Sequence, residues 1–214
     1  MKILALDTAG PHCSVAVTEG GEVLSSLTEI MDRGQAERLV PMAQSALDLS
    51  GIGWRDLDAI AVGVGPGNFT GIRISVAAAR GLALALGIRA IGVSTFDALA
   101  LGREGPTLVS LDARRGRYYL RGYGEADLTP RIVEPFELNA LALPPQTVVL
   151  GHNAGGIAKD LGLVAGSENL LPDPEAFAFA APLVGEHDAP APLYLRSADA
   201  ALPSEAPPPI LDDA

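Results

Sequence analysis

The stretch Val62-Gly-Val-Gly-Pro-Gly-Asn-Phe-Thr-Gly-Ile-Arg73 decides the fold class of this chain. A continuous apolar run, Ala59 to Val62, precedes its glycines, as expected for a strand that is covered on both faces. A segment with helical character follows and extends to Leu86. A strand, a glycine-rich loop and a helix in this order indicate an α/β fold.

The same loop is a candidate phosphate site, because glycines uncover backbone amides and the helix N-terminus carries partial positive charge. However, no lysine follows the glycines as in a P-loop, and the spacing is not that of a Rossmann fingerprint. A simple turn therefore stays the alternative to a nucleotide contact.

Hydrophobic patterning along the rest of the chain predicts an α/β protein of two similar halves. The first half is expected to hold strands at Lys2–Asp7, Cys13–Glu19, Glu22–Glu29, Asp58–Gly65 and Ala90–Val93, with helices at 35–50, 70–86 and from Ser94 to near Gly102. The second is expected to hold strands at Thr107–Asp112, Arg117–Tyr123 and Thr147–Leu150, a short helix after Gly156 and a last helix at Asp173–Val184.

These halves predict two lobes, residues 1–103 and the smaller 104–196, divided at the turn Arg103-Glu104-Gly105-Pro106. Residues 197–214 form an acidic, proline-rich tail that we expect to be disordered. The segment from 172 to 214 carries eight acids and one base.

Composition excludes several classes of protein. The 214 residues include 15 basic and 26 acidic side chains, a net charge of −11, which excludes a uniformly basic nucleic-acid surface. One cysteine, Cys13, excludes a disulfide framework and a thiolate-rich zinc site. Arginines interrupt the longest apolar stretch, Ile72 to Val93, so we expect no membrane span and a cytoplasmic location.

Other candidate residues lie at strand ends and on the helices. Asp7-Thr8 ends the first strand, where a carboxylate can hold a metal-bound phosphate or simply face solvent. Arg114, Arg115 and Arg117 follow Asp112 at a turn, where they either balance that acid or contact RNA or a partner. Small residues surround the helix at 70–86, which favours close approach of a second helix.

Four segments together resemble the TsaB family of tRNA threonylcarbamoyladenosine biosynthesis subunits: MKILALDTA, GPGNFTGIRIS, SLDARRGRYY and APLYLR. The resemblance covers about residues 1–196. It implies the ASKHA fold of actin, Hsp70 and sugar kinases, with a central mixed sheet in each lobe. It also implies a non-catalytic partner of TsaD, the enzyme that threonylcarbamoylates the adenosine beside the anticodon of ANN-decoding tRNAs. TsaE, an ATPase, joins that complex, and TsaC makes the threonylcarbamoyl donor.

The chain departs from catalytic relatives where they bind metal and phosphate. Gln35 and Leu39 stand where TsaD-like enzymes carry a histidine pair, and an amide with an alkyl group cannot share a metal ion. Asp7-Thr8-Ala9 and Leu111-Asp112-Ala113-Arg114 lack the glycines of working phosphate loops. We therefore expect a degenerate pseudo-enzyme with no metal and no ATP bound on its own.

ATP or ADP at the junction of the complex remains an expectation, through Asp7, Thr8, Gly65, Gly67 and Asn68. The alternatives are a stand-alone ASKHA phosphotransferase or carbamoyltransferase, and a metalloprotease, for which the histidine ligands are missing.

In this family the first two long helices pair with those of TsaD, or with a second copy when TsaD is absent. The resemblance therefore implies a heterodimer with TsaD, a homodimer alone, and tRNA contact mainly through the complex. The expected interface comprises Glu37, Pro41, Phe69, Thr70, Gly71, Arg73, Ser75, Ala78, Ala79 and Leu82. Tryptophan in place of Ala78 or Ala79 should block the partner and leave the chain folded.

Overall fold

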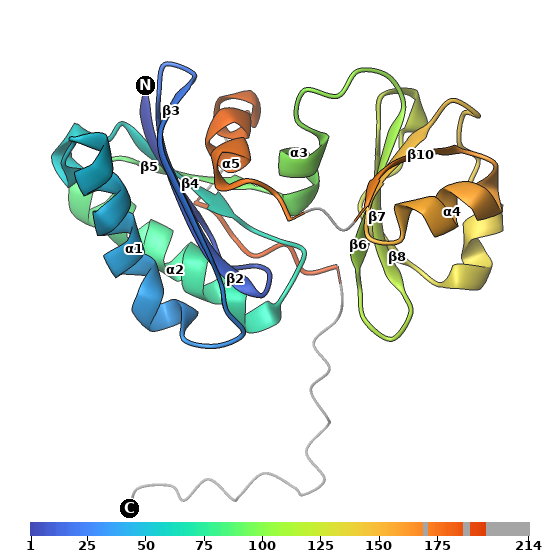
Figure 1. Cartoon of the computed structure of the whole chain (residues 1–214), viewed down its shortest axis with the longest axis horizontal. Helices are drawn as coiled ribbons and strands as arrows, with labels where there is room; N and C mark the ends of the chain where they lie inside the picture. The colour runs from blue at the N-terminus through green and yellow to red at the C-terminus, as the bar shows by residue number, and fades with distance from the viewer. Residues whose placement is uncertain (169–170, 186–188, 196–214) are drawn as a thin grey trace, which may run out of the picture.

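The computed structural model describes residues 1–168, 171–185 and 189–195, and the predicted tail 197–214 lies outside these ranges. Two lobes stand side by side, each with its own sheet (Figure 1). The strands of the first sheet are β1 (Lys2–Asp7), β2 (His12–Glu19), β3 (Glu22–Ile30), β4 (Ala59–Gly63) and β5 (Arg89–Val93). The strands of the second are β6 (Thr107–Asp112), β7 (Tyr118–Tyr123), β8 (Arg131–Val133), β9 (Val148–Gly151) and β10 (Val164–Glu168).

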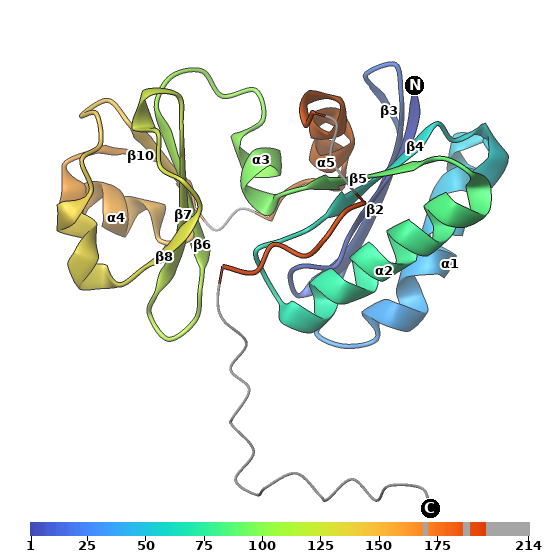
Figure 2. The ribbon, with the colours of Figure 1, turned by 180° about the vertical axis from the view of Figure 1, so that it is seen from behind.

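The first sheet has the order β3-β2-β1-β4-β5. β1 runs antiparallel to β2 and parallel to β4, so the sheet is mixed as expected. The helices α1 (Gln35–Ser50) and α2 (Phe69–Leu86) lie side by side on one face of it, and α5 (Pro174–Ala180) lies on the other (Figures 1 and 2).

Alternation along β1 explains why both faces are covered. Leu4 and Leu6 pack under α1 and α2 with Met42 and Val76. Ile3 and Ala5, one residue out of step, pack under α5 with Phe177 and neighbouring alanines. The run Ile3 to Leu6 is apolar throughout because neither face of the strand meets water.

The second sheet has the order β10-β9-β6-β7-β8, and α4 (Ala154–Leu161) covers one face through Ile157 and Ala158. The helix α3 (Thr95–Ala100) lies between the lobes, where Phe96 and Leu99 pack against Val109 and Tyr119 of the second sheet. The remaining 3₁₀ turns are Trp54–Asp56, Gly124–Ala126, Pro135–Ala140 and Ala181–Leu183.

The chain returns to the first lobe after it has formed the second. The predicted range 104–196 for the second lobe therefore extends too far toward the C-terminus. The elements of the second sheet lie within 107–168, whereas α5 returns to the first sheet. The reason is that β1, β2 and β4 expose an apolar rear face that nothing in residues 1–103 covers except part of α3.

Most predicted elements are confirmed. The strand predicted to run to Gly65 ends at Gly63, and strands β8 and β10 were missed. The short helix predicted after Gly156 begins earlier, at Ala154, and the last helix, predicted to run to Val184, ends at Ala180 and continues as a 3₁₀ turn. β8 is only three residues long, and β10 is mostly exposed, so neither carries a clear apolar pattern. The predicted cap of α3 is confirmed, since Ser94 Oγ accepts a hydrogen bond from the Asp97 amide at 3.0 Å.

Within the described ranges, α2 alone has the length and apolar composition needed to cross a bilayer, and a third of the helix is buried inside the protein. Its buried residues pack against the first sheet. Amphipathic packing of this kind is ordinary for a core helix of an α/β lobe.

Candidate functional site

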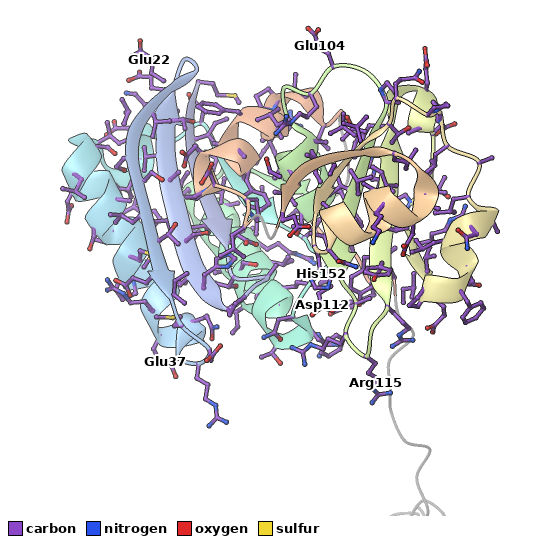
Figure 3. All side chains as sticks on the ribbon, turned by 45° about the vertical axis from the view of Figure 1, so that its right-hand side comes forward. Glu22, Glu37, Glu104, Asp112, Arg115 and His152 are labelled. Carbon is purple, nitrogen blue, oxygen red and sulfur yellow. The ribbon has the colours of Figure 1, made fainter. Side chains whose placement is uncertain are left out.

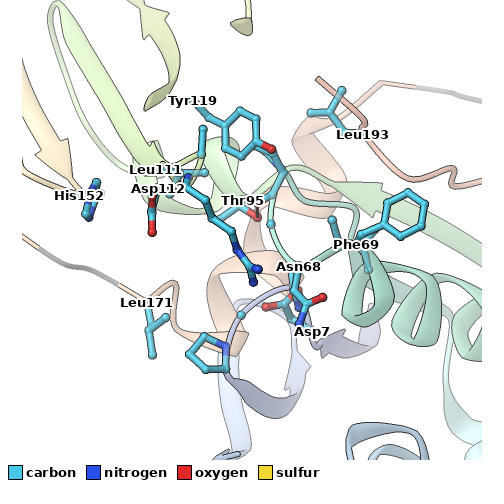
Figure 4. A pocket seen from close by; sticks show the side chains of 18 of the residues that line it. Asp7, Asn68, Phe69, Thr95, Leu111, Asp112, Tyr119, His152, Leu171 and Leu193 are labelled. Carbon is cyan, nitrogen blue, oxygen red and sulfur yellow. Dashed lines mark hydrogen bonds between the residues drawn. The ribbon is translucent and has the colours of Figure 1, made fainter. Parts of the chain in front are cut away.

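A cavity of about 1070 Å³ opens between the two lobes. The first lobe contributes the β1–β2 turn and the loop that leads into α2, and the second contributes the β6–β7 hairpin and His152. In Figure 4, Asp7, Asn68 and Thr95 lie on one side of this cleft, and Leu111, Asp112 and His152 lie on the other. The cleft thus brings the candidate residues Asp7 and Asn68 of the first lobe close to Asp112 of the second, although they are far apart in sequence.

Asp7 is fully engaged inside the protein, at 1% exposure. Its Oδ2 atom lies 2.7 Å from His12 Nε2, and its Oδ1 atom accepts a hydrogen bond from the Ala9 amide at 3.2 Å. A Cβ atom on Gly63 would stand 2.0 Å from Oδ1, so β4 needs a glycine here. The predicted alternative of a solvated strand-end aspartate is wrong, and neither carboxylate oxygen is left without a partner.

Packing, rather than a ligand, accounts for Gly67 in the loop before α2 and for Gly71 in the first turn of α2. A Cβ atom on Gly67 would lie 2.3 Å from the Ala9 carbonyl oxygen, and one on Gly71 would lie 1.9 Å from that of Thr8. The Thr8 hydroxyl in turn donates to the Gly71 carbonyl at 2.7 Å. The loop and the β1–β2 turn therefore touch backbone to backbone, which only glycine allows.

Two backbone amides in this region, those of Asn68 and Thr70, are used within the protein. The Asn68 amide donates to the Ala9 carbonyl at 2.6 Å, and the Asn68 side chain accepts from the Thr70 amide at 3.1 Å as the N-cap of α2. The Gly65 carbonyl accepts from the Thr95 amide at 2.8 Å. Of the residues expected to contact a nucleotide, Gly67 and Asn68 line the cleft, whereas Thr8 and Gly65 are buried beside it.

The same pattern holds on the second lobe. Asp112 Oδ1 accepts a hydrogen bond from the Arg114 amide at 2.7 Å and so closes the β6–β7 turn on itself. Glu168 Oε1 accepts from the Gly155 amide at 2.7 Å, at the N-terminus of α4. Carboxylates of the chain itself thus accept hydrogen bonds from backbone amides on both sides of the cleft. An anion-binding loop would instead leave such amides free to donate to phosphate.

The three predicted arginines have different surroundings. Arg114 lines the cleft. Arg115 is exposed at the tip of the β6–β7 hairpin and points away from both lobes (Figure 3). Arg117 is largely covered, and its Nε atom lies 3.9 Å from Glu134. The predicted cluster is therefore divided, and two of its members remain accessible to a partner or to RNA.

Gln35 and Leu39 are both buried at the start of α1. Gln35 Nε2 donates to the Met31 carbonyl at 3.0 Å, and Leu39 packs in the main core of the first lobe. In the described ranges, no three histidine, cysteine, aspartate or glutamate side chains stand close enough to share a metal ion.

The predicted partner surface is only partly available on the outside of α1 and α2. Glu37, Pro41, Phe69, Thr70 and Arg73 are exposed. Ala78 and Leu82 are half-buried and pack against the core of their own lobe.

Gly71, Ser75 and Ala79 face the first sheet and are fully covered. Ser75 Oγ donates to the Gly63 carbonyl at 3.3 Å. The expectation that tryptophan at Ala79 leaves the chain folded is therefore wrong, because Ala79 is 0% exposed in a close-packed core.

Sequence reasoning missed the true outer face of α2. Ala77, Gly81, Leu84 and Ala85 are exposed, and Leu84 is 85% exposed. On α1, Val40 is also exposed. The signal was available, since Arg73, Ala77, Gly81 and Leu84 recur every three or four residues.

One further cluster of three residues joins the C-terminal segment to α2. The Arg73 guanidinium lies 3.8 Å from the centre of the Phe69 ring, and its Nε atom donates to the Tyr194 hydroxyl at 2.7 Å. The Leu193 amide donates to the Val64 carbonyl at 2.8 Å. Residues 189–195 therefore pass along the first-lobe wall of the cleft.

Comparison with known proteins identifies the family. The family model described as "TsaD: tRNA N6-adenosine threonylcarbamoyltransferase" matches residues 22–171. The "tRNA threonylcarbamoyladenosine biosynthesis protein TsaB" of Escherichia coli K12 is 39% identical over 194 residues, which cover 82% of this chain and 83% of that protein. The chain belongs to the TsaB family. The TsaB of Bacillus subtilis 168 is 35% identical over 122 residues, 56% of this chain and 53% of that protein.

Solved structures agree with this membership of the TsaB family. A Pseudomonas aeruginosa protein described as similar to the peptidase YEAZ superposes with a TM-score of 0.75 and 30% identity, over 91% of this chain and 99% of that one. YeaZ from the same organism gives a TM-score of 0.69 at 30% identity, over 85% and 91%. The expected ASKHA-type fold is confirmed.

Proposed function

We propose that this chain is a non-catalytic scaffold subunit that pairs with TsaD and activates it, within a complex that TsaE joins. A role in tRNA threonylcarbamoyladenosine biosynthesis follows from its TsaB relatives. In this proposal TsaD carries the threonylcarbamoyl transfer, TsaC supplies the donor, and tRNA binds mainly through the complex. Because tRNA is the substrate, we place the chain in the cytoplasm.

The observation that carries this proposal is the outer face of α2. Ala77, Gly81 and Ala85 are exposed and small, and Leu84 beside them is 85% exposed. Small side chains let the backbone of a second helix approach closely, and an exposed leucine gains free energy when that helix covers it. The face therefore fits a partner helix, from TsaD in the complex or from a second copy when the chain is alone.

Hydrogen bonds within the chain support the part of the proposal that says the chain is not itself a catalyst. The amides of Ala9, Arg114 and Gly155 already donate to carboxylates of the chain. Asp7, which would hold a metal-bound phosphate in an ASKHA enzyme, is instead paired with His12. We therefore propose that ATP or ADP is bound only where the complex adds groups from its other subunits.

Reconstitution tests the proposal. The purified chain, TsaD, TsaE and TsaC are mixed with tRNA, threonine, bicarbonate and ATP, and threonylcarbamoyladenosine is measured with and without the chain. We expect strict dependence on the chain and no ATP hydrolysis by the chain alone. Equal modification without it, or ATP turnover or peptide cleavage by the chain alone, would overturn the scaffold role.

A further inference from the structure

Residues 189–195 form no helix or strand, yet they are seated firmly on the first lobe. The Leu193 amide donates to the Val64 carbonyl at 2.8 Å. A Cβ atom built on Gly92 of β5 would stand 3.1 Å from the Pro190 Cβ atom, so the segment passes directly over the edge strand of the sheet. In Figure 2 this red segment crosses the first lobe and ends on the side of the second.

Three consecutive side chains of the segment alternate in direction. Leu193 and Leu195 are half-buried and pack against the cluster that Tyr119 of the second sheet forms with α3. Tyr194, between them, turns to α2, where its hydroxyl accepts a hydrogen bond from Arg73 Nε at 2.7 Å. The segment 193–195 therefore connects the beginning of α2 with the second lobe.

The α2 end of this connection belongs to the outer face of the helix. Exposed residues recur there every four positions: Phe69, Arg73, Ala77 and Gly81. A partner helix that lies along Ala77 and Gly81 reaches Arg73 one turn away. It would then cover the hydrogen bond between Arg73 and Tyr194, and exclusion of water strengthens a hydrogen bond whose donor is charged.

We propose that residues 193–195 form a strap that couples the partner surface of α2 to the orientation of the second lobe. A helix seated on α2 strengthens the hold of Arg73 on Tyr194, and the strap then steadies the second lobe through Leu195. Linkage makes the effect reciprocal, so a strap that is released from the second lobe lowers the affinity of α2 for its partner. The inference rests on the proposed pairing of α2 with TsaD.

A change at the second-lobe end of the strap tests the coupling, because it leaves α2 unaltered. We expect Leu195→Ala to weaken TsaD binding about fivefold in calorimetry. Leu163→Ala is the matched control, since Leu163 is another half-buried leucine that packs in the second lobe but lies outside the strap. It should bind TsaD like the unaltered chain. Equal affinities of Leu195→Ala and the unaltered chain would overturn the proposal.

Hydrogen exchange follows the strap itself, because the Leu193 amide is bonded to the Val64 carbonyl. TsaD should slow exchange of this amide about tenfold in the unaltered chain. The slowing should be smaller in Tyr194→Phe, which keeps the ring and loses the acceptor for Arg73. Exchange that TsaD leaves unchanged in the unaltered chain would contradict the coupling.

A double-mutant cycle tests the strap without TsaD. Arg73→Met and Leu195→Ala change opposite ends of the connection, so either change releases part of the same strap. Urea denaturation should show a smaller loss of unfolding free energy in the double variant than the sum of the two single losses. Additive losses would reject the strap and leave the pairing with TsaD standing, whereas a Gly81→Trp variant that still binds TsaD would reject the pairing through α2.

Discussion

Arg121 on β7 lies 2.8 Å from Asp97 on α3, so one ion pair joins the second lobe to the first. The Tyr123 hydroxyl donates to the same carboxylate at 2.9 Å. Burial, and then the Asp97 carboxylate, raises the pKa of Tyr123, so its hydroxyl stays a donor well into the alkaline range. These contacts hold α3 against the second sheet.

Replacement of Arg121 should loosen this junction. We expect Arg121→Met to lower the free energy of unfolding by about 1–2 kcal/mol, since a partly buried charged hydrogen bond is lost. Urea denaturation measures the change. Arg131→Met is the matched control, because that exposed arginine is bonded only to the Thr129 hydroxyl among the described residues. Equal losses in both variants would contradict the role of the pair.

Replacement of two glycines of α2 by alanine should change the free energy of unfolding in opposite directions. Gly71→Ala places a Cβ atom 1.9 Å from the Thr8 carbonyl oxygen, so we expect a loss of about 3 kcal/mol. Gly81→Ala meets no described atom within 4 Å and should gain about 0.5–1 kcal/mol from helix propensity. Thermal or urea denaturation distinguishes the two, and a neutral Gly71→Ala would refute the close approach.

Bulk on the outer face of α2 should block the partner without unfolding the chain. Gly81→Trp projects from an open helical position, so we expect a normal circular dichroism spectrum and no co-elution with TsaD in gel filtration. Lys159→Trp, on the exposed side of α4, should co-elute like the unaltered chain. A Gly81→Trp variant that still co-elutes would place the interface elsewhere.

Ionisation of the single cysteine, Cys13, should lower the free energy of unfolding at alkaline pH. Burial, with a smaller contribution from Glu29, raises the pKa of Cys13 from 9.0 to about 11. Between these values the unfolded chain loses the proton that the folded chain keeps, so the free energy of unfolding decreases as pH rises. The decrease amounts to about 2–3 kcal/mol by pH 11.

Cys13→Ala is the control for that pH dependence. Lysine and tyrosine titrate alike in both proteins, so a shallower slope between about pH 9 and pH 11 isolates the thiol. Identical slopes would show that Cys13 ionises equally in the folded and unfolded chains.

Local patterns in the sequence predict much of the fold. The bounds of β1 at Lys2–Asp7 and of α1 at Gln35–Ser50 follow from apolar runs, helical spacing and a terminal glycine. The cap at Ser94 is also local, because donor and acceptor lie three residues apart. Such features depend only on residues that are close together in the chain, so they can be recognised directly in the sequence.

The role of each glycine and of each helix face depended on distant neighbours. The GPGNFTG loop has the composition of a phosphate site, yet Gly67 and Gly71 are required because Ala9 and Thr8 pass beside them. Likewise, small residues occur all round α2, and only the position of the first sheet distinguishes Ala79, which is buried, from Ala77, which is exposed.

The sequence by itself determined the α/β class, the order of most elements, the TsaB resemblance and the missing histidine pair. The tertiary structure alone decided that α5 covers the first sheet, that Asp7 is hydrogen-bonded to His12, and that Arg121 is paired with Asp97 of α3. The physical reason is that periodicity and capping act within a few residues, whereas burial and pairing arise between segments that folding brings together.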